Sequence, residues 1–153
     1  MVTEHIGDLL ESGCDIICHQ VNTFGVMGGG LAKQIATKYP ACEKFYKTRL
    51  GYIKECWGDD YILGEVLLYK NKHKNICIAN CLSQNEDGTT NYKAVDRCFK
   101  IVYNYAFDHH LKTIGVPKNY GCGIAIGNWE KVQAILVNIF QDKDIELQIW
   151  EKK

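Results

Sequence analysis

Apolar runs of strand length alternate with segments of helical period along this chain, which predicts an α/β architecture. The run over residues 14–21 is nearly continuous and apolar, typical of a strand buried on both faces in a parallel sheet. A later stripe at helical spacing predicts a long core-facing helix: Tyr92, Val95, Phe99, Val102 and Ala106. We therefore expect a mostly parallel or mixed sheet with helices on both faces.

The other elements follow from the same periodicities and from turn residues. Strands are expected over 1–6, 62–69, 75–79, 112–116 and 145–150. Helices are expected over 31–39, where Pro40 marks the end, over 41–50, and from about 129 with Asn128 as its cap. Thr89 or Thr90 can cap the long helix, and Gly7 begins a turn toward a brief helix.

Two glycine-rich loops follow predicted strands. The first ends in Gly28, Gly29 and Gly30 directly before the helix from Leu31, and the second is Asn119-Tyr-Gly-Cys-Gly123. Such a junction points backbone N–H groups and the positive end of a helix dipole above the strand, which favours an anion, above all phosphate. The spacing fits neither the P-loop nor the dinucleotide-binding pattern, so a merely tight structural turn remains the alternative.

Length and charge narrow the ligand class. A chain of 153 residues with 46% hydrophobic content fits one globular domain over residues 1–153. Its formal net charge is zero, from 18 basic and 18 acidic residues, so no global field attracts DNA, RNA or an anionic membrane. We expect no bulk nucleic-acid binding, and an anionic ligand must be held locally by backbone dipoles.

The N-terminus carries no pattern of a signal peptide, and no apolar stretch approaches the ~20 residues of a membrane span. We therefore expect a cytoplasmic protein without a membrane partner, in which the eight cysteines are reduced. Cys14, Cys18, Cys77 and Cys98 fall on apolar faces, where thiols behave as small hydrophobes. Because Cys77 and Cys81 lack zinc-site spacing, we expect no metal, and nothing indicates a cofactor.

Three motifs together resemble those of the macro domain family. They are Gly7-Asp-Leu-Leu10, His19-Gln-Val-Asn22 leading to Met27-Gly-Gly-Gly-Leu-Ala32, and Val116-Pro-Lys-Asn-Tyr-Gly-Cys-Gly-Ile124. The resemblance extends from about residue 1 to Trp150 and implies a three-layer α/β/α domain with a central mixed sheet. It also implies ADP-ribose or a derivative as ligand. Within the family the chain is most similar to the branch of ADP-ribose 1″-phosphate phosphatases and terminal ADP-ribose glycohydrolases.

The resemblance also implies residue roles. The aspartate matching Asp8 binds the adenine amino group, the asparagine matching Asn22 contacts the distal ribose, and a histidine matching His19 is tied to phosphatase activity. We therefore expect His19 and Asn22 to be catalytic. The other residues expected to contact the ligand are Leu9, Gln20, Met27, Gly28, Gly29, Gly30, Leu31, Ala32, Ser83, Asn119, Tyr120, Gly121, Cys122, Gly123, Ile124 and Trp150.

Several of these residues have a structural alternative. Asp8 can be a turn or cap residue, and His19 can be a buried imidazole bonded to a backbone carbonyl. Tyr120 and Trp150 can stack on adenine or ribose, or belong to the core. Cys122 can hold a thiolate near the loop amides, but packing under the loop is the favoured interpretation.

The glycohydrolase branch uses a lysine after a strand matching residues 76–79 and an aspartate after the second glycine loop. Here the first region, Asn80-Cys-Leu-Ser-Gln84, holds no lysine, and the second has Ala125 in place of the acid. Both departures count against that covalent mechanism. Because the match at His19 supports a phosphatase, we expect a hydrolase that removes phosphate from ADP-ribose 1″-phosphate. The alternatives are a non-catalytic ADP-ribose-binding module, whose ligand can include ADP-ribosylated macromolecules, and a glycohydrolase using an activated water oriented by Ser83 or Gln84.

Overall fold

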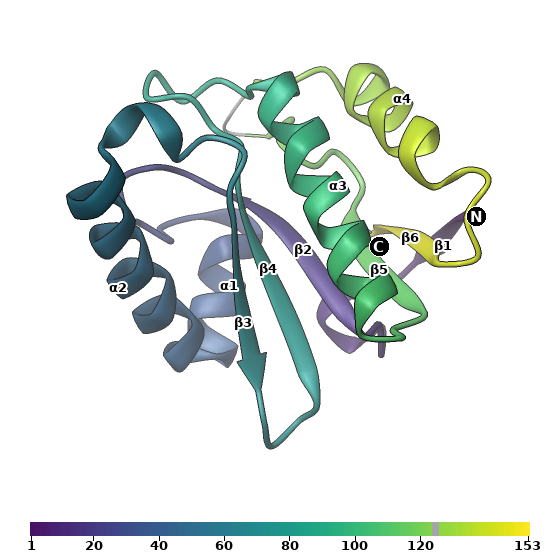
Figure 1. The fold of residues 1–153 in the computed structure, drawn as a ribbon. Coiled ribbons are helices and arrows are strands. Elements are labelled where there is room, and N and C mark those ends of the chain that lie inside the picture. Colours follow the sequence, from purple (N-terminus) through teal and green to yellow (C-terminus); the bar gives the residue numbers. More distant parts are fainter. Residues whose placement is uncertain (124–125) are drawn as a thin grey trace.

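In the computed structural model, which describes residues 1–123 and 126–153, a six-stranded sheet lies between helices (Figure 1). Neighbouring strands are parallel, except that β3 and β4 are antiparallel. The sheet is therefore mixed, as predicted. Its strand order is β1 (Val2–Ile6), β6 (Glu146–Glu151), β5 (Thr113–Pro117), β2 (Ile16–Val21), β4 (Ile76–Leu82) and β3 (Val66–Asn71).

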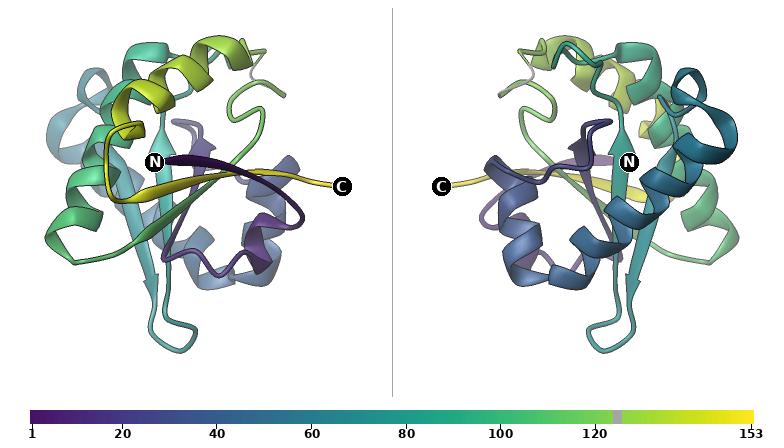
Figure 2. Two further views of the ribbon diagram at one scale, coloured as in Figure 1. Left: turned by 90° about the vertical axis from the view of Figure 1, so that its right-hand side faces the viewer. Right: turned by 90° about the vertical axis from the view of Figure 1, so that its left-hand side faces the viewer.

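Helices cover both faces of the sheet. One layer holds α1 (Gly30–Lys38), α2 (Pro40–Trp57) and the 3-10 helix η1 (Leu9–Glu11). The other layer holds α3 (Tyr92–Asp108) and α4 (Trp129–Phe140). Figure 2 shows α1 and α3 on opposite sides of the strands. This arrangement confirms the predicted three layers. Over the described residues, no helix combines the length and apolar character needed to cross a membrane.

Strand β2 lies in the middle of the sheet and faces both layers. Ile16 and Cys18 pack into the core under α3 and α4, whereas Ile17 and Val21 pack into the core under α1 and α2. All four side chains are buried. The nearly continuous apolar run in the sequence thus has its physical cause, because neither face of β2 meets water.

The helix boundaries correct two expectations. Pro40 is the first residue of α2 rather than only the end of α1. Proline is tolerated there because the first residue of a helix makes no N–H hydrogen bond within the helix. The cap of α3 is Asn91, whose side chain accepts a hydrogen bond from the Ala94 amide at 2.9 Å. Thr90, one of the two expected caps, instead donates from its hydroxyl to the Gly121 carbonyl at 2.5 Å.

The predicted strands shift by a few residues. Strand β3 begins at Val66 rather than residue 62, because Gly64 takes a left-handed φ of +94° that turns the chain. Strand β4 continues to Leu82 rather than ending at residue 79. Asn80 therefore lies in register with His19 on β2. Helix α2 also runs to Trp57, beyond the predicted 41–50.

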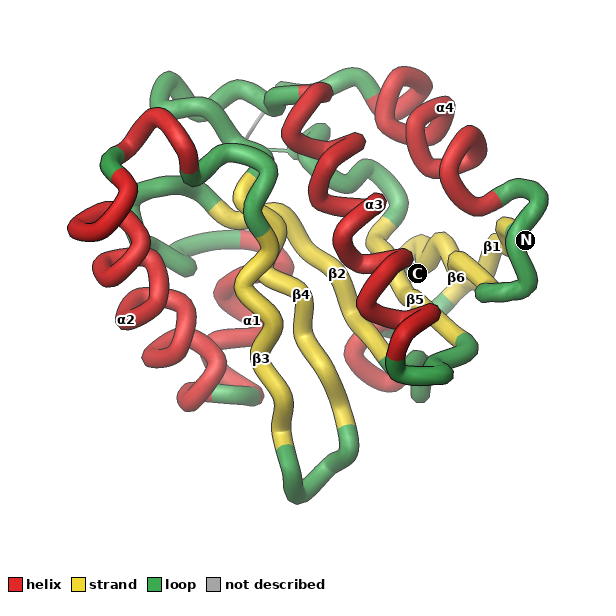
Figure 3. Tube along the Cα trace, in the orientation of Figure 1, coloured by secondary structure: helices red, strands yellow, loops and turns green. Residues whose placement is uncertain are grey.

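The carboxyl ends of the parallel strands share one edge of the sheet. The loops after β2, β4 and β5 meet there, at the top of Figure 3, whereas the β3–β4 turn extends from the opposite end. Because ligands in such sheets bind outside the carboxyl ends of the strands, this rim is the natural place for a site. Both glycine loops lie on it, as predicted.

Candidate ligand-binding cleft

A cleft of about 370 Å³ opens on this rim between the loops that follow β2 and β5. Most of the residues that the sequence assigned to ligand binding line it. They are His19, Gln20, Asn22, Gly28, Gly29, Gly30, Leu31, Ala32, Asn119, Tyr120, Gly121 and Gly123. Five further residues line it: Val21, Val26, Gln84, Pro117 and Lys118. Of these, only Gln84 had been given a role from the sequence, as a group that can orient a water.

Other predicted site residues lie outside the lining of this cleft. Leu9 and Met27 are buried in the core under α1 and α2, because their long apolar side chains complete that layer. Ser83 is fully buried beneath the rim. The remaining members of this group are Asp8, Cys122 and Trp150. Ile124, together with Ala125, lies outside the described residues.

The N-terminus of α1 forms one wall of the cleft. Its first helical hydrogen bond runs from the Lys33 amide to the Gly29 carbonyl at 3.2 Å. The amides of Gly30, Leu31 and Ala32 precede that bond and lack an acceptor within the helix. Gly30 has a left-handed φ of +56°, which glycine adopts without steric cost. Donors and the positive end of the dipole therefore point at the cleft, as an anion site requires.

Asn22 holds the first glycine loop in shape. Its Oδ1 accepts hydrogen bonds from the amides of Phe24 at 3.0 Å and Val26 at 3.3 Å, and its Nδ2 donates to the Val26 carbonyl at 2.9 Å. The Tyr46 hydroxyl from α2 lies 2.9 Å from the same Oδ1 and accepts from the Gly25 amide at 3.2 Å. The side chain expected to meet the distal ribose is thus already engaged by its own loop.

The second glycine loop is a tight turn fixed to its neighbours. Asn119 and Gly121 have φ values of +65° and +69°. A Cβ on Gly121 would lie 2.7 Å from the Thr90 hydroxyl, so only glycine fits there. The Gly121 carbonyl accepts from the Thr90 hydroxyl and from the Gly127 amide, which lies 3.0 Å away. The loop is therefore preorganised opposite α1.

A buried polar network connects three strand ends beneath this loop. Gln20 donates from Nε2 to the Ser83 hydroxyl at 3.0 Å, and that hydroxyl lies 2.6 Å from the Tyr120 hydroxyl. The Tyr120 ring is buried and meets Phe99 edge to face at a centroid distance of 5.2 Å. Tyr120 therefore belongs to the core, which is the second of the two alternatives stated for it. Ser83 supports the loop rather than facing the ligand.

Cys122, next in the same loop, packs as a structural residue. Its sulfur lies 3.2 Å from the Tyr120 carbonyl, and burial raises the pKa of its thiol. A raised pKa disfavours the reactive thiolate at neutral pH. The packing interpretation is therefore correct. The predicted positions of the other cysteines on apolar faces are also confirmed, since Cys14, Cys18, Cys77 and Cys98 are all buried.

Asp8 and Trp150 lie at the β1 and β6 end of the rim. Asp8 caps η1 by accepting from the Leu10 amide at 2.9 Å, which confirms the cap interpretation, and its exposed carboxylate keeps a second oxygen. The half-buried Trp150 ring stacks on His5 at a centroid distance of 4.9 Å, and its Nε1 donates to Gln148 at 2.9 Å. Contact of Asp8 with adenine stays a prediction.

His19 is buried below the cleft with 2% of its surface exposed. Its Nε2 lies 2.6 Å from Oδ1 of Asn80, whose Nδ2 donates to the Leu67 carbonyl at 2.9 Å. Since that Oδ1 must accept, the proton is on Nε2. Nδ1 has no partner among the described residues. Burial lowers the imidazole pKa, so the ring is neutral. The alternative of a buried imidazole is therefore correct in its burial, but the partner is the Asn80 side chain rather than a backbone carbonyl, because β4 extends far enough to bring Asn80 alongside.

A larger hollow of about 750 Å³ lies between the end of α2 and α3. It is lined by Ile53, Trp57, Tyr61, Leu63, Glu65 and Arg97 and shares no residue with the cleft. Its walls are mainly apolar and lack a glycine loop or a helix N-terminus. Because specific ligand sites need convergent polar groups, the smaller cleft is the better candidate.

Comparisons with known proteins agree with this architecture. No protein-family model matches the sequence. A 17.5 kDa protein from the tk-vs intergenic region of Enterobacteria phage T4 is 29% identical over 140 residues, spanning 88% of this chain and 86% of the phage protein. The macrodomain of Mycobacterium tuberculosis DarG superposes with a TM-score of 0.85 at 23% identity, covering 98% of this chain and 97% of that one.

A solved structure of Thermosipho africanus DarTG in complex with ADP-ribose is also similar. It has a TM-score of 0.82 at 18% identity and covers 97% of this chain and 41% of that one. The mixed sheet, its helix layers and these superpositions lead to one conclusion: the chain has the three-layer α/β/α fold of the macrodomains.

Proposed function

We propose that residues 1–153 form a single domain whose cleft binds ADP-ribose, with one site per chain. The observation that carries the proposal is the set of amides at the start of α1 that have no acceptor within the helix, facing a second glycine loop across the cleft. Two phosphates joined by one oxygen are a fitting ligand for donors on two opposed loops. The ADP-ribose complex of the structurally similar Thermosipho africanus protein supports the same ligand class.

The size of the cleft and the order of strands along the rim support this assignment. The cleft volume of about 370 Å³ lies within the range of roughly 300–1,000 Å³ usual for small-molecule sites. Asp8 follows β1, and Asn22 follows β2, with β6 and β5 between them. A long ligand lying across these strand ends can place its adenine at the Asp8 end and its phosphates between the glycine loops.

Isothermal titration calorimetry with ADP-ribose tests the proposal. We expect saturable heat with a stoichiometry of one, together with a rise in melting temperature, because a ligand that binds only the folded state stabilises it. Adenosine, which lacks the diphosphate, is the matched control and should bind much more weakly. Neither heat nor a melting shift at millimolar ADP-ribose would contradict the assignment.

We further propose that the protein hydrolyses an ADP-ribose derivative, removing phosphate from ADP-ribose 1″-phosphate. The observation favouring chemistry is His19, which lines the cleft as a neutral imidazole whose Nδ1 has no partner among the described residues. Such a lone pair can accept a proton or hold a water for attack on phosphorus. Since only 2% of His19 is exposed, Nδ1 reaches a ligand only through a local opening of the structure around it.

Phosphate release from ADP-ribose 1″-phosphate tests the second step separately. Binding of ADP-ribose without phosphate release would favour a non-catalytic binding module. Release of ADP-ribose from an ADP-ribosylated macromolecule, without a covalent adduct, would favour a glycohydrolase that uses an activated water. Either result leaves the ADP-ribose site intact and changes only the reaction.

A further inference from the structure

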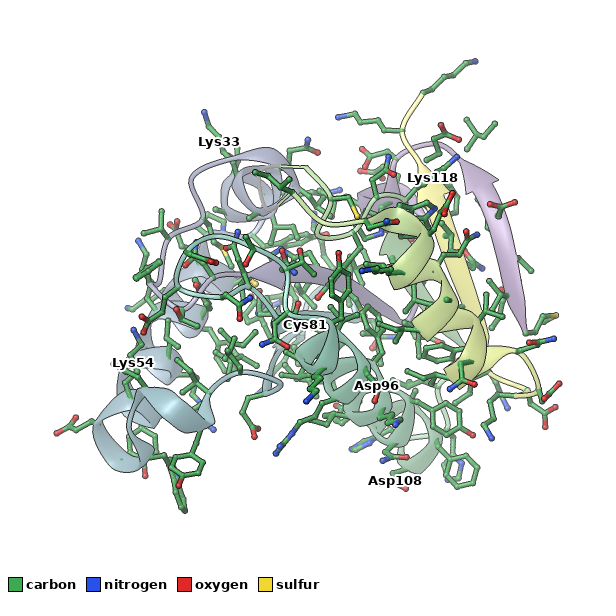
Figure 4. All side chains as sticks on the ribbon, turned by 90° about the horizontal axis from the view of Figure 1, so that it is seen from above. Lys33, Lys54, Cys81, Asp96, Asp108 and Lys118 are labelled. Atoms are coloured by element: carbon green, nitrogen blue, oxygen red, sulfur yellow. The ribbon has the colours of Figure 1, made fainter. Side chains whose placement is uncertain are left out.

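Lys118 is the one fully charged side chain among the described residues that line the cleft. The other polar members are amides, a tyrosine and the neutral His19. Lys118 directly follows β5, and its amide donates to the Trp150 carbonyl on β6 at 2.8 Å. Its backbone is therefore fixed at the rim between a proline and the left-handed Asn119. Figure 4 shows Lys118 beside the end of β6.

The ammonium group of Lys118 has a partner that a ligand can replace. Its Nζ lies 3.3 Å from Oε2 of Glu151, the last residue of β6. The Lys118 side chain is 34% exposed and that of Glu151 is 55% exposed, so this ion pair is in contact with solvent. Exposed ion pairs of this kind contribute little to stability, and exchange of one anionic partner for another costs little.

An ADP-ribose diphosphate in the cleft needs more than backbone dipoles. It carries two negative charges, whereas the chain has a formal net charge of zero and offers only partial charges at the glycine loops. A flexible ammonium is a compact donor that can follow a phosphate oxygen without fixed geometry. Lys118 lies directly before the second glycine loop and lines the same cleft, so it is placed to supply that charge.

We propose that Lys118 determines ligand charge specificity in this cleft by exchanging its Glu151 partner for a ligand phosphate. This inference rests on the proposed ADP-ribose site and assigns it one side chain. Glu151 then acts as a competitor. In the free protein its carboxylate holds the Lys118 ammonium at the rim. When the ligand is bound, the carboxylate competes for the ammonium and repels the phosphate.

The test compares four variants by calorimetry with ADP-ribose between about 50 and 500 mM salt, a range over which the Debye length falls from above to well below about 10 Å. Lys118→Gln should weaken ADP-ribose binding by about threefold to tenfold, as expected for the loss of a charge-assisted contact that is partly exposed to solvent. It should also make the affinity for ADP-ribose less dependent on salt. Lys118→Arg, which keeps the charge, should retain affinity. Glu151→Gln should tighten binding. Lys72→Gln removes an equal charge from the exposed β3–β4 turn and should change nothing.

The outcomes separate this inference from the proposed function. If the unmodified protein binds ADP-ribose but Lys118→Gln binds within twofold of it with the same salt dependence, Lys118 has no role in binding. Weaker binding by Glu151→Gln would show that the carboxylate assists rather than competes, which also overturns the proposal. Absence of binding by the unmodified protein overturns both assignments. Melting temperatures of all variants, measured without ligand, identify any loss that comes from unfolding.

Discussion

The imidazole of His19 on β2 and the carboxamide of Asn80 on β4 are joined by a buried hydrogen bond of 2.6 Å from Nε2 to Oδ1. The bond is possible because the two residues are in register on adjacent parallel strands. Asn80 is itself fixed by its donation to Leu67 on β3. Three strands thereby set the tautomer of the one imidazole that lines the cleft.

This pair predicts a pH dependence of stability. Burial lowers the folded-state pKa of His19 below its ordinary value of 6.5, so the unfolded chain takes up a proton before the folded one does. Stability is therefore fully present above about pH 6.5 and falls as pH drops toward the folded pKa, by at most about 1.4 kcal/mol per pH unit. Urea unfolding from pH 7.5 to 5 measures it. In His19→Gln this part of the slope should disappear, and an unchanged slope would contradict a buried neutral imidazole.

Substitution of His19 should also separate chemistry from binding. If the phosphatase proposal is correct, His19→Ala lowers the turnover of ADP-ribose 1″-phosphate by about a hundredfold to ten-thousandfold, the usual contribution of a positioned acid–base group. Affinity for ADP-ribose should change little, because the loop amides provide most of that contact. Asn80→Ala keeps the imidazole but frees its orientation, so a smaller rate loss and a shifted pH–rate profile are expected. Full activity in His19→Ala would make His19 a structural residue.

Tyr46 should affect the cleft without lining it. Its buried hydroxyl donates to the Asn22 backbone carbonyl at 2.5 Å and accepts from the Gly25 amide. Tyr46→Phe removes these bonds and should lower the free energy of unfolding by about 1–3 kcal/mol and weaken ADP-ribose binding by loosening the loop. Chemical denaturation and calorimetry measure both. Tyr69→Phe, which alters a partly exposed ring outside the cleft, is the control, and equal losses in both variants would contradict a specific role for Tyr46.

Two glycines of the second loop should respond in opposite ways. A Cβ at Gly123 meets no atom of the described residues within 4 Å, whereas one at Gly121 meets the Thr90 hydroxyl at 2.7 Å with a φ of +69°. Gly123→Val should therefore fold with nearly unchanged stability but obstruct the ligand, and Gly121→Val should lose stability. Thermal melts and ADP-ribose titrations of both variants provide the comparison. Normal ADP-ribose binding by a folded Gly123→Val would place the ligand elsewhere.

The arrangement of elements could be predicted because burial on two faces leaves a continuous apolar run in β2, and a one-sided core leaves a helical stripe in α3. The glycine loops could also be predicted, because a run of glycines directly after a strand stands out in the sequence. The direction in which individual side chains point could not be predicted. Tyr120 lies in a loop sequence that suggests a ligand contact, yet its ring enters the core because Ser83 and Phe99 provide partners there.

The residues missed by the sequence depend on contacts far apart in the chain. The partnership of His19 with Asn80 requires β4 to continue through a polar residue, which a hydrophobicity pattern does not indicate. Lys118 stands inside a recognised motif, but its importance comes from Glu151 and from its position on the rim, and both appear only when β5 and β6 lie side by side.

A covalent lysine adduct is not expected with an ADP-ribosylated substrate. Asn80 is buried in β4, and residues 81–84 offer no amine. Borohydride reduction during incubation, followed by peptide mass spectrometry, detects such an adduct. The amine to inspect is Lys118, because it lines the cleft. Its trapping would contradict this prediction and would favour a glycohydrolase with a nucleophile at a new position.

If the two glycine loops hold the ligand, an NMR titration of the ¹⁵N-labelled protein with ADP-ribose should locate it there. The largest shifts are expected at the amides of Gly28, Gly29, Gly30, Leu31, Ala32, Gly121 and Gly123, with saturation at one ligand per chain. Shifts confined to the hollow around Trp57 and Tyr61, or no saturable shifts at all, would contradict a site between these loops.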